Sequence, residues 1–196
     1  MKTAIQILLT IVILVLVYLI YDSIMEPVHF RQEARQREAR VIERLKDIRT
    51  AQIAHRSRYG RFTGDLDSLV DFIKHDSLPV VMAIGTVPDT LTEVEAVRKG
   101  IVQRDTVWTP TYDSLFRNKR YSVDSLPYVP FSGGERFSME AGKIERGLVE
   151  LPVFEASCKI PHYMRGLEEL YRIYYTREEG LKVGSMIESS LDGNWE

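Results

Sequence analysis

The fold is decided by the stretch IRTAQIAHRSRYGRFTGDLDSLVDFI, which runs from Ile48 to Ile73. A basic run with helical spacing stops at Tyr59 and Gly60, passes a Phe-Thr-Gly turn, and restarts as an acidic amphipathic segment. Glycine commonly follows the last residue of a helix, because it adopts the left-handed backbone conformation at little cost. The stretch therefore predicts one helix ending at Tyr59, a turn, and a second, short helix that lies against the first.

Upstream of this turn, residues 28–60 are expected to form one amphipathic helix. The segment is rich in Arg, Gln, Glu and Ala, and neither Gly nor Pro interrupts it between Pro27 and Gly60. Apolar side chains recur at helical spacing, and Gln52 and His55 continue the stripe, so one face is expected to pack on the rest of the chain. The apolar positions are Val41, Leu45, Ile48, Ala51 and Tyr59. Pro27 is expected to kink the helix at its start.

A coiled coil and a basic binding strip are the alternatives for this helix. Its apolar repeat is shorter than the three or four heptads that a coiled coil needs. Between Val28 and Gly60 the chain has nine Lys or Arg against four Asp or Glu, but acids interrupt the strip and aromatics do not interleave with it, which disfavours nucleic acid. Glu43 and Asp47 are expected on the solvated flanks. The arginines expected to contact lipid headgroups or an acidic partner are Arg31, Arg35, Arg37 and Arg40.

Before this helix, residues 3–21 form the uncharged segment TAIQILLTIVILVLVYLIY. At about 1.5 Å per residue, a helix of this length spans nearly the ~30 Å of a bilayer's hydrocarbon core. We therefore expect a transmembrane anchor over residues 1–27. A cleaved signal peptide is the alternative, but the run is longer than a signal core and no small-x-small cleavage site follows it. The anchor residues are Ile5, Leu8, Leu9, Ile11, Leu14, Leu16, Tyr18 and Tyr21, with the tyrosines at the interface.

The order of these features resembles that of type IV pilins and type II secretion pseudopilins. An apolar N-terminal helix, a proline, an amphipathic continuation, the motif YGRF from Tyr59 to Phe62 and a small Asp/Leu helix follow one another over residues 1–73. The resemblance implies a long helix that is half in the membrane or a fibre core and half packed on an antiparallel sheet. It also implies that Tyr59, Gly60 and Phe62 form the junction between helix and domain.

Two features of the sequence favour opposite orientations of the anchor. The arginines that follow it favour a cytoplasmic domain by the positive-inside rule, since only Lys2 precedes it. The very short N-terminal flank and the resemblance favour a domain outside the inner membrane, in the periplasm, and this is what we expect. The chain departs from the pilin pattern in its leader, because no carboxylate and no glycine lie between Met1 and Tyr21. The resemblance therefore does not predict leader processing here.

Residues 61–196 are expected to form one α+β domain with short helices and an antiparallel sheet. Asp65 is the expected N-cap of the first helix, and a second is expected over residues 90–100. Pro152 indicates an edge position or a strand start. The glycines of FSGGERF, residues 131–137, indicate a hairpin turn. Strands are expected over residues 78–87, which should be buried, and over 101–108, 120–131, 135–144, 148–160 and 180–189.

The tripeptide Asp-Ser-Leu recurs in this domain and is explained by turn chemistry. Asp and Ser favour helix caps and turns, and the leucine that follows can enter the core. The uneven spacing of the tripeptide excludes a solenoid repeat. It begins at Asp67, Asp76, Asp113 and Asp124.

No motif for phosphate, dinucleotide, zinc-protease or nucleophile-elbow chemistry is present. Cys158 is the only cysteine and is expected to be buried. Together with His162 it provides too few ligands for zinc, which needs three or four. No cofactor, metal or catalytic residue is predicted.

These observations predict a non-catalytic, single-pass inner-membrane protein. It is expected to be a structural or assembly subunit of an envelope, secretion or pilus-like complex. Its partners are then the bilayer and other membrane or envelope proteins, with copies of itself among the candidates. Gln6 and Thr10 are the expected hydrogen-bonding groups between anchors. The alternative is a membrane-tethered cytoplasmic adaptor or sensor domain that binds a protein partner.

Overall fold

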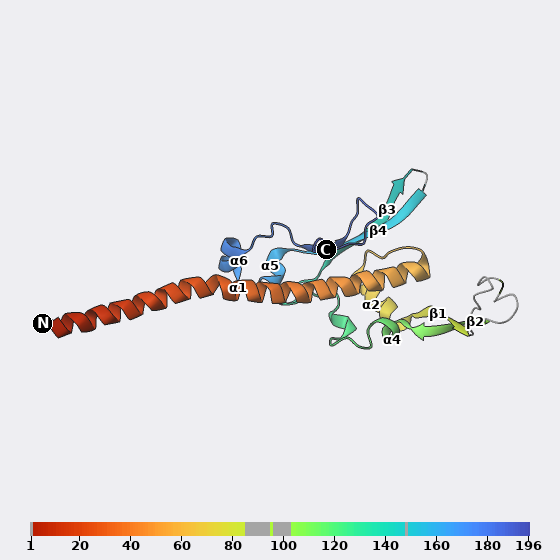
Figure 1. The fold of residues 1–196 in the computed structure, drawn as a ribbon. Coiled ribbons are helices and arrows are strands. Elements are labelled where there is room, and N and C mark those ends of the chain that lie inside the picture. Colours follow the sequence, from red (N-terminus) through yellow and green to blue (C-terminus); the bar gives the residue numbers. More distant parts are fainter. Residues whose placement is uncertain (1, 85–94, 96–102, 148) are drawn as a thin grey trace.

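The computed structural model describes residues 2–84, 95, 103–147 and 149–196. Its longest element is helix α1, Lys2–Tyr59, which has 58 residues. Figure 1 shows a small domain gathered around the C-terminal half of α1, while the N-terminal half extends alone. The fold is α+β, as predicted: a long N-terminal helix packs on a small domain of short helices and antiparallel sheets.

Helix α1 passes through Pro27 and ends where the sequence predicts. A proline removes one backbone hydrogen bond and commonly bends a helix, and the axis of α1 changes direction close to helix α6, Glu168–Tyr174 (Figure 1). At the other end, Gly60 has a φ of +73°, and its amide donates to the carbonyl of Arg56 over 2.7 Å. The left-handed glycine therefore terminates the helix, as expected from YGRF.

Helix α2, Leu66–His75, begins after the predicted cap. The carboxylate of Asp65 accepts hydrogen bonds from the amides of Asp67 and Ser68, over 3.4 and 2.8 Å. These bonds satisfy donors that the first turn of a helix leaves free. Apolar spacing places Leu66, Leu69, Val70 and Ile73 on one side of this helix, and all four are buried, together with Phe72.

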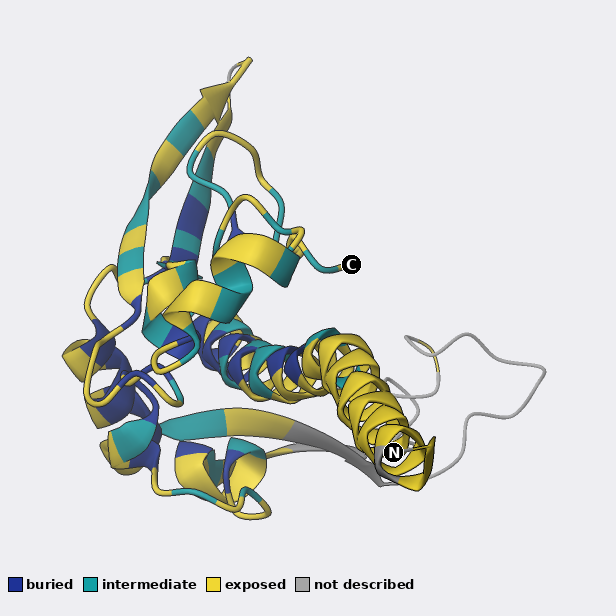
Figure 2. Cartoon of the chain, turned by 90° about the vertical axis from the view of Figure 1, so that its left-hand side faces the viewer, coloured by how far each residue is buried: buried dark blue, intermediate teal, exposed yellow. Residues whose placement is uncertain are grey.

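The strands form two separate antiparallel sheets. Strand β1, Ser77–Ile84, pairs with β2, Gln103–Pro110, as a two-stranded ribbon. The second sheet has the order β3-β4-β5, with β3 at Ser138–Arg146, β4 at Val149–Cys158 and β5 at Leu181–Gly184. Figures 1 and 2 place these sheets on opposite sides of the C-terminal half of α1. The helix therefore lies between them as the central element.

Short helical segments complete the domain. Helix α4, Thr111–Leu115, follows β2, and the 3-10 helix η1 occupies Val123–Ser125. Helix α5, Ile160–Tyr163, follows β4 and leads to α6. Figure 1 shows that α6 is the part of the domain nearest to the N-terminal half of α1.

The core forms where α1 meets these elements (Figure 2). Four of the five predicted positions, Val41, Leu45, Ile48 and Ala51, are fully buried. Each aliphatic side chain of this kind contributes about 1.5–3 kcal/mol when it is buried. The fifth position, Tyr59, is half-exposed because it lies in the last turn of α1, at the edge of the core.

Some predicted elements differ from the structure. Residues 78–87 do contain a strand, but Val80 is 41% exposed, because β1 belongs to a two-stranded ribbon rather than to a covered sheet. Residues 120–131 are not a strand: Ser122 caps η1 through its side chain, and two prolines follow. The expected helix over residues 90–100 lies, apart from Glu95, outside the described residues. Helices α4, α5 and α6 are not predicted by the sequence pattern.

Several turn and edge predictions are confirmed. Residues 149–154 of β4 pair only with β3, because β5 reaches only Glu155 to Cys158, so Pro152 lies on a locally free edge. In FSGGERF, an antiparallel bridge joins Tyr128 to Arg136, as a hairpin turn requires. The four Asp-Ser-Leu aspartates lie at helix ends, as turn chemistry predicts. Asp67, Asp113 and Asp124 are in first turns, and Asp76 is the C-cap of α2.

Candidate membrane and partner interface

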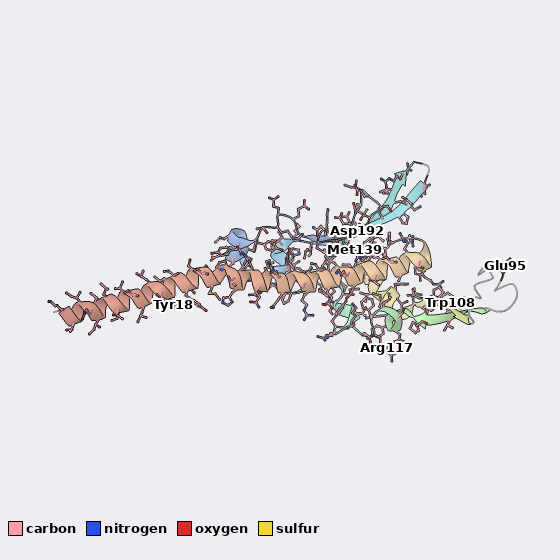
Figure 3. All side chains as sticks on the ribbon, viewed as in Figure 1. Tyr18, Glu95, Trp108, Arg117, Met139 and Asp192 are labelled. Atoms are coloured by element: carbon pink, nitrogen blue, oxygen red, sulfur yellow. The ribbon has the colours of Figure 1, made fainter. Side chains whose placement is uncertain are left out.

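The N-terminal half of α1 presents apolar side chains on every side. The eight predicted anchor residues, from Ile5 to Tyr21, are 51–65% exposed, and Figure 3 shows the side chains around Tyr18 projecting in all directions. Soluble monomers rarely expose apolar surface of this extent. Among the described residues, α1 is the one helix long and apolar enough to cross a membrane. These features fit a single membrane-spanning helix.

Gln6 and Thr10, like Thr3, are polar side chains within the apolar surface of the anchor. The hydroxyl of Thr10 donates to the carbonyl of Gln6 over 2.9 Å, within the same helix. Membrane helices commonly satisfy a hydroxyl in this way. The side-chain amide of Gln6 has no hydrogen-bond partner among the described residues, so Gln6 is the stronger candidate for a contact between anchors.

The predicted junction residues lie together at the end of α1 that is farther from the anchor. Phe62 is buried, and its ring centroid lies 4.8 Å from that of Phe154 on β4. The hydroxyl of Tyr59 donates to Asp76 over 2.6 Å, and this hydrogen bond raises the pKa of Tyr59. The junction therefore joins α1 both to the three-stranded sheet and to the end of α2.

Gln52 and His55 of α1 contact the turn that joins α1 to α2. The fully buried amide of Gln52 donates to the carbonyl of Thr63 over 2.6 Å and accepts from its amide over 3.1 Å. The ring of His55 lies 4.8 Å from that of Tyr59 and 5.1 Å from that of Phe72. Both side chains continue the buried stripe, as predicted, and their polar atoms serve the turn rather than a ligand.

The four arginines expected to contact lipid or a partner are divided by the structure. Arg31 and Arg35 are exposed, and Arg40 pairs with Glu43 over 3.4 Å. Arg37 differs from the expectation: its side chain is only 15% exposed. Its guanidinium donates to the carbonyl oxygens of Tyr163 and Arg165, over 3.3 and 2.8 Å, and to Glu33 over 2.6 Å. Arg37 therefore holds α5 against α1.

Sequence reasoning missed a buried polar cluster on α1. Asp47 was expected on a solvated flank, but it is buried, accepts a hydrogen bond from the Tyr121 hydroxyl over 2.6 Å and pairs with Lys119 over 2.6 Å. The guanidinium of Arg44 lies 3.4 Å from the centre of the Tyr121 ring. Burial, together with the hydrogen bond to Asp47, raises the pKa of Tyr121. The cluster fastens the segment around Tyr121 to α1.

A second cluster was also missed and lies near α6. The hydroxyls of Tyr163 and Tyr175 are 3.0 Å apart, and Tyr175 donates to Glu38 of α1. The Nε of Arg177 pairs with the same carboxylate over 3.4 Å. Burial raises the pKa of Tyr163 to about 12 and also raises that of Tyr175. Both clusters join segments that are more than seventy positions apart in the sequence; Asp47 and Tyr121, for example, are separated by 74 positions. No local sequence pattern therefore predicts these clusters.

Cys158 is buried, as predicted, and burial raises the pKa of its thiol to about 12. A thiol with such a pKa is protonated at neutral pH and reacts slowly. Across residues 2–84, 95, 103–147 and 149–196, no group of three His, Cys, Asp or Glu side chains could hold a metal ion.

Comparison of the chain with protein-family models, curated proteins and solved structures finds no match. The pilin-like order of features over residues 1–73 therefore stands on the sequence pattern alone.

Proposed function

We propose that this protein is a non-catalytic, single-pass inner-membrane protein with an exported, pilin-like α+β domain. In this proposal it acts as a structural or assembly subunit of an envelope, secretion or pilus-like complex. The observation that carries the proposal is the continuity of α1 from Lys2 to Tyr59. One half exposes apolar side chains suited to lipid, and the other half is the central element of the domain.

A shared helix supports a structural role because it leaves no linker between anchor and domain. Just beyond the anchor, Arg37 of α1 donates to the carbonyl of Tyr163 in α5. Glu38, the next residue of α1, accepts a hydrogen bond from Tyr175, which follows α6. The domain is therefore held at a defined height above the membrane, as a subunit that stacks or docks with neighbours requires. In both buried clusters the polar groups are paired with one another, which is their ordinary use in stabilising a fold.

The side of the membrane is tested by thiol labelling in intact cells. Cys158 is a poor reporter because it is buried, so it is first replaced by alanine. Ser189→Cys then places a thiol on an exposed residue of the domain, and the matched variant Lys2→Cys places one before the anchor. A membrane-impermeant maleimide is expected to label Ser189→Cys in intact spheroplasts and Lys2→Cys only after lysis.

The reverse pattern would overturn the export of the domain. It would favour the alternative, a membrane-tethered cytoplasmic adaptor, which the arginines that follow the anchor support through the positive-inside rule. Assembly is tested in the same cells with an amine-reactive crosslinker. We expect the chain in a band larger than the monomer, and a monomer alone would contradict the role of a subunit.

A further inference from the structure

A cleft of about 600 Å³ lies between α1 and the residues at the end of α6. One wall is formed by α1, through residues 30–38, and the other by residues 174–177. The rings of Tyr174 and Tyr175 lie 6.1 and 6.4 Å from that of Phe30. The cleft is thus lined by aromatic residues together with Arg31, Arg35 and Arg177.

The position of the cleft along α1 places it at the membrane surface. Tyr21 ends the uncharged segment, and Arg31 follows it ten residues later, which is about 15 Å along a helix. Headgroups occupy about 5–8 Å on each side of the hydrocarbon core. Long side chains on a helix lean towards its N-terminus. The guanidinium of Arg31 therefore approaches the headgroup layer from above, and that of Arg35 lies one turn behind it.

The charges of the cleft favour an anion. Neither Arg31 nor Arg35 has a hydrogen bond or ion pair among the described residues, whereas the two nearby carboxylates are engaged. Glu38 accepts from Tyr175 and pairs with Arg177. Glu26 accepts from the hydroxyl of Tyr174 over 3.3 Å. Two unpaired guanidinium groups four residues apart lie on the same side of a helix and can donate to one phosphate group together.

Helix α6 adds an apolar contact beside the cleft. Ile173, in its last turn, is 70% exposed. Tyr171 and Tyr174 belong to the same short helix, and tyrosines are enriched where proteins meet the headgroup layer. Figure 1 shows α6 beside the part of α1 that emerges from the anchor. An exposed aliphatic side chain at this height is suited to the boundary between headgroups and acyl chains.

We propose that the cleft between α1 and α6 binds the headgroup of an anionic phospholipid. Arg31 and Arg35 donate to its phosphate, and Ile173 contacts the start of an acyl chain. This inference rests on the membrane insertion of α1 that the proposed function assumes, but it does not depend on the side of the membrane.

The test uses the full-length chain in nanodiscs of phosphatidylcholine. A fluorophore is attached to Ile173→Cys in a Cys158→Ala background, and nitroxide-labelled phosphatidylglycerol or phosphatidylcholine is titrated in as quencher. We expect half-maximal quenching at a lower mole fraction of phosphatidylglycerol than of phosphatidylcholine. In Arg31→Gln/Arg35→Gln the mole fraction of phosphatidylglycerol needed is expected to rise by about 25-fold, since each arginine near an anionic surface contributes about fivefold.

The matched control is Arg117→Gln/Arg120→Gln, which removes the same charge from exposed positions elsewhere in the domain (Figure 3). This control is expected to keep the preference. Equal quenching by both lipids, or a preference that survives the loss of Arg31 and Arg35, would overturn the proposal. A preference abolished by inorganic phosphate at matched ionic strength would assign the cleft to the free anion and would also overturn it.

The two proposals fail in distinguishable ways. Both faces of a nanodisc have the same composition, so the preference for anionic lipid is measurable even if thiol labelling places the domain in the cytoplasm. If the domain is exported and crosslinked but shows no preference for anionic lipid, the proposed function stands and the lipid site is excluded.

Discussion

The two halves of α1 share one helical backbone but differ in what covers them. The described side chains of residues 3–21 are mostly apolar and all exposed, whereas the C-terminal half is more polar and contains the buried positions Val41, Leu45 and Ile48. Burial in the domain therefore follows the arrangement of apolar residues, not their number. A one-sided stripe specifies which face the domain covers, whereas a helix that is apolar all round can be covered only by lipid or other helices.

The largest expected effect comes from shortening one leucine in each half. Leu45→Ala should lower the free energy of unfolding of the domain by about 2–5 kcal/mol, because it leaves a cavity among fully buried neighbours. Leu14→Ala should change it by less than about 0.5 kcal/mol, because Leu14 contacts no part of the domain. Urea unfolding of the full chain in detergent micelles, followed by near-UV circular dichroism, measures both. Equal losses of unfolding free energy in Leu45→Ala and Leu14→Ala would show that burial in the domain is not confined to the C-terminal half of α1.

The second prediction concerns Gly60, the residue that terminates the C-terminal half of α1. A Cβ at Gly60 would meet no atom within 4 Å, yet its φ is +73°. Gly60→Val should therefore cost about 1–2 kcal/mol through backbone strain alone. Gly60→Asn is the matched control and should cost less, because asparagine tolerates the left-handed conformation. Thermal unfolding compares them, and an unchanged melting temperature for the valine variant would contradict the role of Gly60 as a helix terminator.

The smallest expected effect concerns the cap of α2, which covers the end of the buried stripe. Hydrogen bonds from Ser68 hold the pKa of Asp65 below its ordinary value of 3.8. A carboxylate with a depressed pKa stabilises the fold above that value and loses its contribution as the pH falls through the folded pKa. Asp65→Ala should cost about 1 kcal/mol at pH 7, and this cost should shrink as the pH falls below 3.8 and through the folded pKa of Asp65.

The control for this variant is Asp71→Ala, which removes the same charge from α2 without a side-chain hydrogen bond. Stability curves measured from pH 7 to low pH should converge for Asp65→Ala and the unsubstituted chain. A constant difference across this range would show that the carboxylate does not act through its charge.

Local signals explain which parts of the fold the sequence predicts. Gly60 and Asp65 act within a few residues of themselves, so the end of α1 and the start of α2 can be placed from the chain alone. The apolar composition of residues 3–21 does the same for the anchor. By contrast, the division of the strands into two sheets depends on pairing partners, which no local pattern specifies.

The rest of the candidate interface depends on contacts between distant residues. Arg37 lies four residues before Val41, on the phase of the apolar stripe, but the carbonyl oxygens of Tyr163 and Arg165 that its guanidinium contacts come from a distant segment. Helix α6 is short, and isolated helices of its length are not stable in water. It is supported by α1, through Phe30 and Glu26, so its position could not be predicted from its own residues.

Tyr174 contacts α1 on both sides of Pro27, through its hydroxyl at Glu26 and its ring near Phe30. These contacts link α6 to α1 across the proline, and the part of α1 beyond the anchor forms one long arm. The arm from Ile24 to Tyr59 is about 50 Å long at 1.5 Å per residue. A change of about 10° in the tilt of the anchor, of the kind that bilayer thickness imposes, moves the far end by about 9 Å. In an inserted helix, the tilt of the anchor would therefore set where the far end of α1 lies.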